Sequence, residues 1–281
     1  MLLEGAIGDA YGMGFEYANE NIQYNDLSSY VKHPKHGLYP GQYTDDTQMS
    51  IALAEMMLSG LDWTPINIAT KFVECFKRDW RDGYSRLFQA FLERISSGEQ
   101  FLAEIKPDSD KSGGAMRASC IGLFGLPDEV LEKTTIQCKL THDTPDGIAA
   151  AQASSLLTYY LAKEFGHPKD AGLYLNHYIE SDHNWNEDYV GKVKSKGWMS
   201  VRAAITAVKR NNSLSVLLKD CINFTGDVDT VATIALSAAS CSKYYIKDLP
   251  QKLIDTLENG KYGKDYLVGL DKQLLSRFNV I

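Results

Sequence analysis

Apolar residues recur at helical spacing along almost the whole of this 281-residue chain. Small and apolar side chains follow this spacing most clearly in residues 50–58, 148–165, 201–208 and 228–240. No run of useful length alternates with the period of two that marks a β-strand. Glycine and proline interrupt the pattern at 35–37, 107, 125–127, 166–168 and 197. The sequence therefore predicts an all-α fold of roughly a dozen helices, with the chemistry at helix starts.

Length and composition narrow the class of protein. The chain lies near the upper limit for one hydrophobic core, so its length allows one domain or two. It has no internal repeat, and the continuous helical pattern leads us to expect a single domain over residues 1–281. No segment approaches the roughly 18–20 consecutive apolar residues that span a bilayer, so no membrane association is expected. Residues 1–5 lack the features of a signal peptide. The five cysteines are widely spaced and form no CxxC pair, which favours reduced thiols in a cytoplasmic protein.

The charge balance argues against a nucleic-acid partner. The net charge is −7, from 36 acidic and 29 basic residues, whereas proteins that hold a nucleic-acid backbone present a basic face. The most basic stretch, Lys77-Arg78-Asp79-Trp80-Arg81, is short and interrupted by acid, and we expect it to be a solvated helix end. An anionic small ligand stays compatible with this charge, because bound metal ions can supply local positive charge.

Two short acidic clusters stand immediately before apolar helical segments. Thr44-Asp45-Asp46-Thr47 and Gly226-Asp227-Val228-Asp229-Thr230 each offer two carboxylates and a threonine hydroxyl. Helix capping alone would explain either cluster. Together they form an all-oxygen set of the kind that Mg²⁺ and Mn²⁺ prefer. Two such ions about 3.5–4 Å apart would offset the repulsion among the carboxylates, provided that the clusters meet in space.

Five motifs resemble those of the ADP-ribosylglycohydrolase family, which includes dinitrogenase reductase-activating glycohydrolase. They follow the family order, and Glu16 stands at the acidic position after the first of them: Gly5–Gly12 (GAIGDAYG), Thr44–Thr47 (TDDT), Gly113–Arg117 (GGAMR), Leu140–His142 (LTH) and Gly226–Thr230 (GDVDT). Any one of these arises readily by chance. Five in order over nearly the whole chain form a specific signal.

The resemblance implies a compact orthogonal multi-helix bundle of the ADP-ribosylglycohydrolase type, with a two-metal cleft for Mg²⁺ or Mn²⁺. It implies six metal ligands: Thr44, Asp45, Asp46, Asp227, Asp229 and Thr230. By the same resemblance Glu16, Asp45 and Asp46 act in catalysis, with Glu16 near the C1″ carbon of the ribose. The transition state would resemble an oxocarbenium ion, as in other glycoside cleavage.

The glycine-rich motif is assigned to the diphosphate of ADP-ribose. Glycines in Ser112-Gly113-Gly114 let backbone amides approach a phosphate before a helix expected from Ala115. A plain glycine-rich helix start is the alternative. His142 is expected to donate to phosphate or ribose, with a core or capping histidine as the alternative, and Arg117 is expected to be structural. His177 and His183, near Asp182, are expected to be surface residues.

Three departures from the family pattern are visible. Thr225 stands where the family often has glycine, and Val228 stands where it often has threonine. Val228 removes a hydroxyl but spares the three expected ligands of that motif. Residues 106–110 contain no aromatic residue that could stack on adenine, so the adenine site is unassigned.

The leading hypothesis is a hydrolase that removes ADP-ribose from mono-ADP-ribosylated protein, at arginine, and so reverses an ADP-ribosyltransferase. The implied partners are the modified protein, ADP-ribose as product and a cognate ADP-ribosyltransferase. Serine-, ester- or nucleic-acid-linked ADP-ribose is an alternative substrate. A second hypothesis is a binding or immunity protein that blocks a transferase, since proteins like this family also serve as crystallins and immunity proteins. A third is a two-metal phosphohydrolase.

Overall fold

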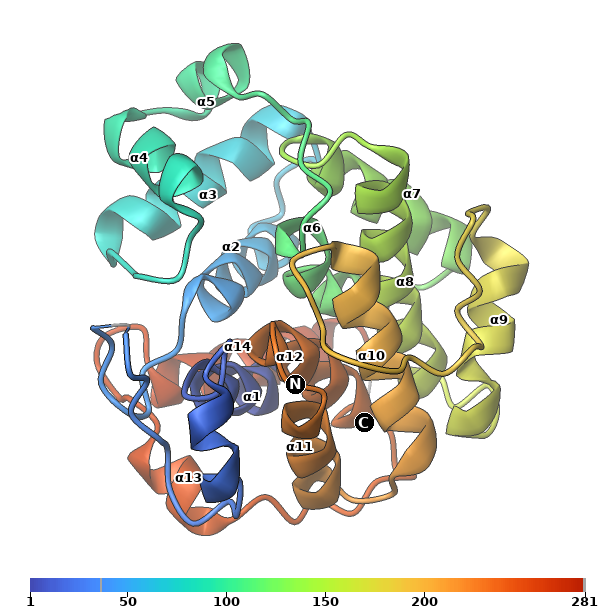
Figure 1. The fold of residues 1–281 in the computed structure, drawn as a ribbon. Helices are drawn as coiled ribbons and strands as arrows, with labels where there is room; N and C mark the ends of the chain where they lie inside the picture. Colours follow the sequence, from blue (N-terminus) through green and yellow to red (C-terminus); the bar gives the residue numbers. More distant parts are fainter. Residues whose placement is uncertain (36, 280–281) are drawn as a thin grey trace.

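The computed structural model describes residues 1–35 and 37–279, and in them the chain folds into helices without a named strand (Figure 1). The all-α prediction is confirmed. The fourteen α-helices in these residues are α1 (Leu2–Met13), α2 (Asp45–Leu58), α3 (Pro65–Arg78), α4 (Arg86–Arg94), α5 (Gly98–Glu104), α6 (Gly113–Met116), α7 (Pro127–Lys139), α8 (Pro145–Ala162), α9 (Ala171–Tyr178), α10 (Gly197–Arg210), α11 (Leu214–Asn223), α12 (Val228–Ala239), α13 (Gln251–Thr256) and α14 (Lys264–Arg277). Short 3₁₀ helices span η1 (Asn19–Tyr24), η2 (Ser119–Leu123) and η3 (Pro168–Asp170).

Serine and threonine caps explain where several helices begin. Thr44, Thr64, Thr144 and Ser213 each accept a hydrogen bond from a backbone N–H in the first turn of the helix that follows. Proline occupies an early position in α3 and α8, where its missing N–H costs no helical hydrogen bond. Each of the four segments with the clearest periodicity lies mostly or wholly in a helix. The long one, expected to end at residue 165, ends at Ala162.

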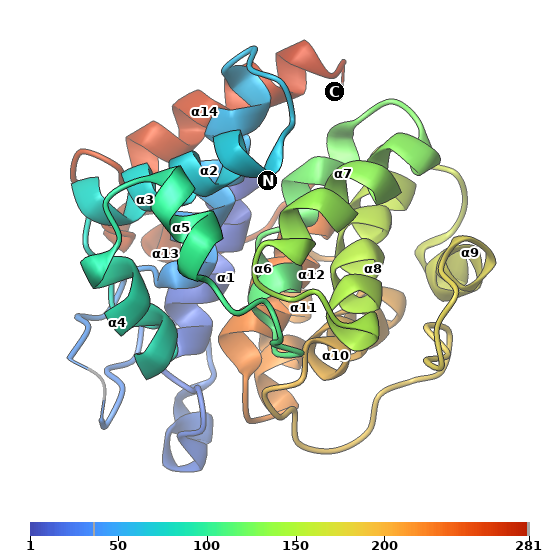
Figure 2. The ribbon, with the colours of Figure 1, turned by 90° about the horizontal axis from the view of Figure 1, so that it is seen from above.

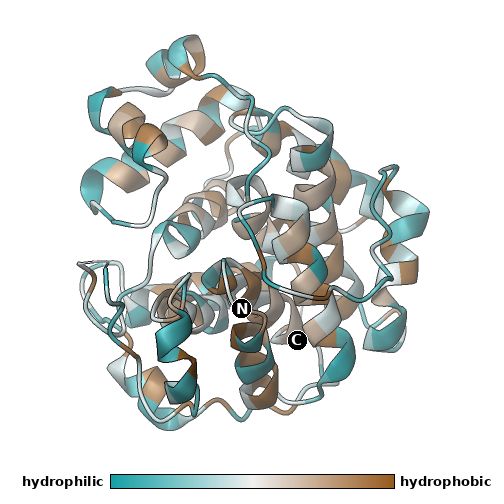
Figure 3. Cartoon of the chain, in the orientation of Figure 1, coloured by the Kyte–Doolittle hydropathy of each residue, from teal (hydrophilic) through white to brown (hydrophobic). Residues whose placement is uncertain are grey.

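Helix α12 lies at the centre of the bundle, and all of its residues are buried. It packs against α1, α8, α10 and α11, and Figure 2 shows these helices grouped around it. In Figure 3 hydrophilic residues gather on the loops and outer helix surfaces, while the hydrophobic stretches lie inside the bundle. None of the helices in the described residues is both long enough and apolar enough to cross a bilayer.

A stripe of glycines brings α1 unusually close to α12. A Cβ atom on Gly8 would lie 2.7 Å from the carbonyl oxygen of Ala232. A Cβ on Gly5 would overlap the hydroxyl of Ser237, and one on Gly12 would overlap the Cα of Asp229. The backbones can approach this closely only because these positions lack side chains. As a result, the chain leaves α1 directly beside the start of α12.

Candidate metal centre and ADP-ribose site

The two acidic motifs begin two different helices that meet near the end of α1. Thr44 is the N-cap of α2, and its hydroxyl accepts the backbone N–H of Asp46. Asp227 is the N-cap of α12, and Asp229 and Thr230 lie in its first turn. The structure therefore places the six predicted ligands at helix starts, as expected.

Three carboxylates form the tightest acidic group. One oxygen atom from each of Glu16, Asp227 and Asp229 lies within 4.8 Å of the others, and the group could hold a metal ion. The family resemblance implies that Glu16 is a catalytic group separate from the six ligands. The structure adds its carboxylate to the same group.

Burial and mutual repulsion perturb these acids. Burial and the negative charges of Asp9 and Glu16 raise the pKa of Asp45 well above its usual range. Burial, Asp227 and Asp9 raise the pKa of Glu16 to about 8. Such shifts are expected when carboxylates are brought together without a cation. The arrangement is therefore one that positive charge would stabilise.

Asp46 belongs to the same electrostatic group as the second motif. Burial and the charges of Asp9, Asp45 and Asp227 raise its pKa well above its usual range, while the hydroxyl of Thr230 opposes this. One oxygen of Asp46 and one of Asp229 are buried without a hydrogen-bond partner in the described residues. An unpartnered buried carboxylate oxygen is costly unless a cation or water binds it.

Asp9 is the site residue that the sequence analysis did not single out. It is completely buried in α1, and its carboxylate accepts both the backbone N–H and the hydroxyl of Thr44 and of Thr47, at 2.6–3.0 Å. Asp9 lies within the Gly5–Gly12 motif, but no local feature of the sequence indicates that its carboxylate bonds to Thr44, 35 residues away. Asp9 holds the first acidic motif in place from the opposite helix.

The turn before α12 is held by backbone hydrogen bonds. Thr225 and Gly226 both have positive φ angles, 60° and 93°. The N–H of Val193 donates to Thr225, and the carbonyl of Val193 accepts from Asp227. Glycine would suit position 225 better than threonine, because a β-branched residue is disfavoured in the left-handed region.

The glycine-rich motif lies next to the acidic group. The hydroxyls of Ser200 and Ser112 face the carboxylate of Asp227 and oppose the rise in its pKa that burial causes. The helix expected from Ala115 is instead α6, a single turn from Gly113 to Met116. A turn this short adds little dipole, so any phosphate contact would depend on the amides themselves.

His142 is held in one tautomer by a chain of hydrogen bonds. The guanidinium of Arg117 donates to the Thr141 hydroxyl at 2.8 Å, and this hydroxyl lies 2.6 Å from Nδ1 of His142. Arg117 has no acceptor, so Nδ1 is the partner to which this hydroxyl can donate its own proton, and we assign the ring hydrogen to Nε2. Within the described residues Nε2 has no hydrogen-bond partner, and a Cβ on Gly113 would lie 3.2 Å from it.

The same environment keeps His142 neutral. Burial, Arg117 and Lys111 lower its pKa to about 3. It can therefore donate one hydrogen bond beside Gly113 across the physiological pH range. Arg117 is buried and also donates to Gln137, consistent with the structural role expected for it.

The histidines near Asp182 do not form a cluster with it. His183 bonds to Asp146 at 2.9 Å and stacks on the ring of Trp198. His177 is packed edge-on against the ring of Tyr178. Both are surface or half-buried residues with structural partners.

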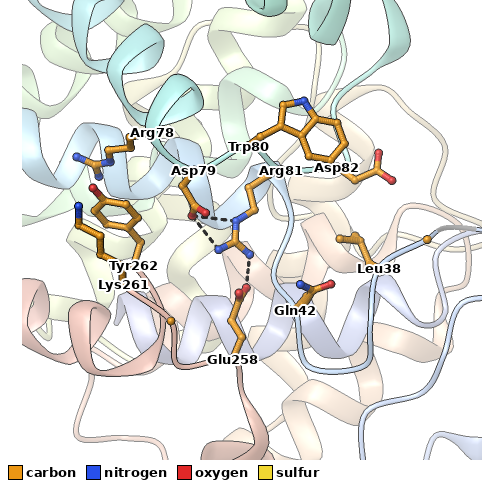
Figure 4. Close-up of a pocket in the computed structure, with 12 residues that line it drawn as sticks. Leu38, Gln42, Arg78, Asp79, Trp80, Arg81, Asp82, Glu258, Lys261 and Tyr262 are labelled. Carbon is orange, nitrogen blue, oxygen red and sulfur yellow. Dashed lines mark hydrogen bonds and ion pairs between the residues drawn. The ribbon is translucent and has the colours of Figure 1, made fainter.

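A cavity of about 590 Å³ lies beside the residues that precede Thr44. Figure 4 shows Arg81 between Asp79 and Glu258, with an ion pair to each. The guanidinium also lies 3.9 Å from the ring centre of Tyr43. The prediction of a solvated helix end was wrong for Arg81, which is 8% exposed and fixes the chain just before the first acidic motif.

The chain is similar to known proteins over nearly its whole length. The sequence model of the ADP-ribosylglycohydrolase family matches residues 1–280. The chain is 23% identical to ADP-ribosylarginine hydrolase Tri1 of Serratia proteamaculans, over 90% of this chain and 72% of that protein. It is 22% identical to ADP-ribosyl-[dinitrogen reductase] glycohydrolase of Rhodospirillum rubrum, over 90% and 87%. A solved structure described as an ADP-ribosylglycohydrolase-related protein complex shares the fold, with a TM-score of 0.74 and 19% identity over 99% of this chain and 95% of that one.

Proposed function

This chain belongs to the ADP-ribosylglycohydrolase family, whose members are hydrolases of glycosyl bonds, and from this premise we propose that it removes ADP-ribose from arginine in mono-ADP-ribosylated proteins. The observation that carries the proposal is the convergence of Glu16, Asp227 and Asp229 in one group. The names of two relatives, an arginine-specific hydrolase and a glycohydrolase of a modified enzyme, support a protein substrate. This hydrolysis would undo the modification made by a cognate ADP-ribosyltransferase.

The donor set fits two divalent ions. Unpartnered buried oxygens on Asp46 and Asp229 lie where ligands are expected, and all the donors are oxygen, as Mg²⁺ or Mn²⁺ requires. We assign the ligands to Thr44, Asp45, Asp46, Asp227, Asp229 and Thr230. When bound, the ions would supply Lewis acidity and offset the carboxylate charge. Phosphoester chemistry would suit a similar set, but the family assignment favours the glycosyl bond.

The chain's own residues would bind and orient ADP-ribose. His142, neutral and with its hydrogen on Nε2, would donate to a phosphate or ribose oxygen, and the amides of Ser112–Gly114 would face the diphosphate. With the diphosphate bound in this way, the distal ribose would lie toward the carboxylates, because Ser112 faces Asp227.

Glu16 is positioned to handle a proton. Its pKa of about 8 in the metal-free protein is close to neutral pH, where a carboxyl group can both hold and release a proton. In the hydrolysis, the C1″–N bond breaks, the oxygen of water bonds to C1″, and the proton from water goes to the departing guanidine nitrogen. The carboxylates would stabilise the positive charge that develops on the ribose.

Release of ADP-ribose from arginine-ADP-ribosylated protein tests the proposal. We expect release with Mg²⁺ or Mn²⁺ and none with chelator. Glu16→Gln leaves the six assigned ligands in place, so it should keep metal binding and slow turnover by about 10²–10⁴-fold. The control Asp128→Asn, at an exposed acid on α7, should behave as wild type.

Release that survives chelator would contradict metal dependence. Release only from serine- or ester-linked substrates would move the proposal to that linkage, and binding of ADP-ribose without release from any substrate would favour the binding-protein hypothesis.

A further inference from the structure

The residue after Glu16 is held in a backbone conformation that its side chain disfavours. Tyr17 has a φ angle of 48°, in the left-handed region. Its N–H donates to the carbonyl of Gly226 at 3.0 Å, and Nε2 of His33 bonds to the carbonyl of Glu16 at 2.8 Å. The first bond fixes Tyr17 to the turn that carries Asp227, and the second holds the peptide group before Tyr17. The fold therefore imposes the direction of the Tyr17 side chain at the expense of local strain.

The side chain of Tyr17, whose backbone is strained, is partly open to solvent beside the acidic group. Tyr17 is 46% exposed. Burial of the rest of the side chain, with the negative charges of Asp227, Glu16 and Asp229, raises the pKa of its hydroxyl. The ammonium of Lys192 lies 5.2 Å from the ring centre. The ring thus already attracts one cation in a negative environment.

The chemistry of this position favours a planar cation. A guanidinium is flat, weakly hydrated and stacks well on an aromatic face. A neutral base such as adenine carries no positive charge for the face of the ring to attract. Serine-linked ADP-ribose would present no cation here at all.

We propose that Tyr17 determines the acceptor specificity of the site, by stacking on the guanidinium of the ADP-ribosylated arginine. This inference rests on the proposed hydrolase function and adds the contact that selects arginine. The strain at Tyr17 is then the cost of placing an aromatic ring next to the bond that is broken.

Replacement with glycine separates this role from a structural one. Tyr17→Gly removes the ring and also relieves the backbone strain, so the melting temperature should rise or stay constant. We expect kcat/KM on an arginine-linked peptide to fall about 3- to 30-fold, the range of a cation–π contact. Activity on the matching serine-linked peptide should change less than about twofold if that peptide is a substrate. Tyr17→Phe keeps the ring and should restore the arginine activity.

Two further measurements complete the test. Inhibition by methylguanidine should weaken by the same factor in Tyr17→Gly, whereas the affinity for free ADP-ribose should not change. Tyr24→Ala, at a 54% exposed tyrosine on η1, is the matched control. It should alter neither the inhibition by methylguanidine nor the affinity for ADP-ribose.

The outcomes are distinguishable. Equal losses on both linkages, unchanged arginine activity and methylguanidine inhibition, or a large fall in melting temperature would overturn the role of Tyr17 while leaving the hydrolase function in place. If wild-type protein leaves arginine-linked ADP-ribose intact, the proposed function fails, and the inference fails with it.

Discussion

The carboxylate of Asp9 accepts the hydroxyl of Thr47 at 2.6 Å, and this short bond joins α1 to the first turn of α2. Three more bonds from Thr44 and Thr47 reach the same carboxylate. All four donors of the TDDT motif that point inward are thereby satisfied by one side chain. The carboxylates of Asp45 and Asp46 take no part in these four bonds and are left for other partners.

Asp9→Ala should be strongly destabilising, because four buried donors lose their acceptor. We expect a loss of about 3–5 kcal/mol in the free energy of unfolding. Urea unfolding in the absence of metal measures it, with Asp128→Ala as the control. A loss below about 1 kcal/mol would mean that the threonines find other partners.

The metal-free protein should lose stability as pH rises from 4.5, the ordinary pKa of a glutamate, toward 8, the raised pKa of Glu16. In this window the folded state binds more protons than the unfolded state, so each step up in pH favours unfolding. The raised pKa values of Asp45, Asp46 and Asp229 act in the same direction.

Melting temperatures in chelator and in Mg²⁺ across this window test the prediction. Saturating Mg²⁺ should remove most of the decline, because a bound cation stabilises the charged carboxylates, and Glu16→Gln should reduce the decline in chelator. A flat profile in chelator would show that the acids do not interact as the structure indicates.

Thr225→Gly should stabilise the protein. Thr225 has a φ angle of 60°, and its backbone N–H and carbonyl are both hydrogen-bonded, so glycine preserves those bonds while removing the strain. After the extra chain entropy of glycine, we expect a gain of about 0.5–1 kcal/mol. Calorimetry should show a rise of about 1–4 °C in melting temperature. Thr225→Ala should lie between glycine and wild type, and a lower melting temperature for the glycine variant would refute the argument.

Thr141→Val should weaken ADP-ribose binding, because it removes the hydroxyl that fixes the His142 tautomer. We expect a loss of about 5- to 30-fold in affinity by calorimetry. The ¹⁵N spectrum of His142 should show Nε2–H as the main tautomer in wild type and a mixture in the variant. Thr135→Val, in helix α7 just before Thr141, is the control and should leave both unchanged. A wild-type spectrum with the hydrogen on Nδ1 would remove the basis for this prediction.

Gly12→Ala should reduce both metal affinity and stability, because a Cβ there would overlap the Cα of Asp229 and push α1 away from α12. We expect a cost of about 1–3 kcal/mol in unfolding free energy, typical of overpacking. Gly269→Ala is the matched control, since a Cβ at this helical glycine would meet nothing within 4 Å. Equal behaviour of the two variants would show that the helix contact is more tolerant than its geometry indicates.

Short-range signals made much of this protein predictable. Thr44 and Thr144 cap helices in ways that depend only on the next few residues, so the helix starts and the acidic motifs could be located from sequence. The pairing of those motifs in space came from the family resemblance. Their chemistry followed from the residue types.

Long-range contacts account for what was missed. Asp9 bonds to residues 35 and 38 positions away, and Arg81 pairs with Glu258, 177 positions away. Neither partner can be found from local spacing. Tyr17 was missed for a related reason, because its strain comes from a bond to Gly226 that only the folded chain contains.

The contact between α1 and α12 also dictates when the site can form during synthesis. The two helices are separated by more than 200 residues of chain. At typical rates of translation, α1 is complete about 10–40 s before α12 has been made. Until then its glycine stripe has no partner, and Glu16 has neither Asp227 nor Asp229 beside it. The acidic centre therefore forms late, when α12 packs against α1. A ribosome that stalls before residue 239 would carry a chain in which this centre cannot yet form.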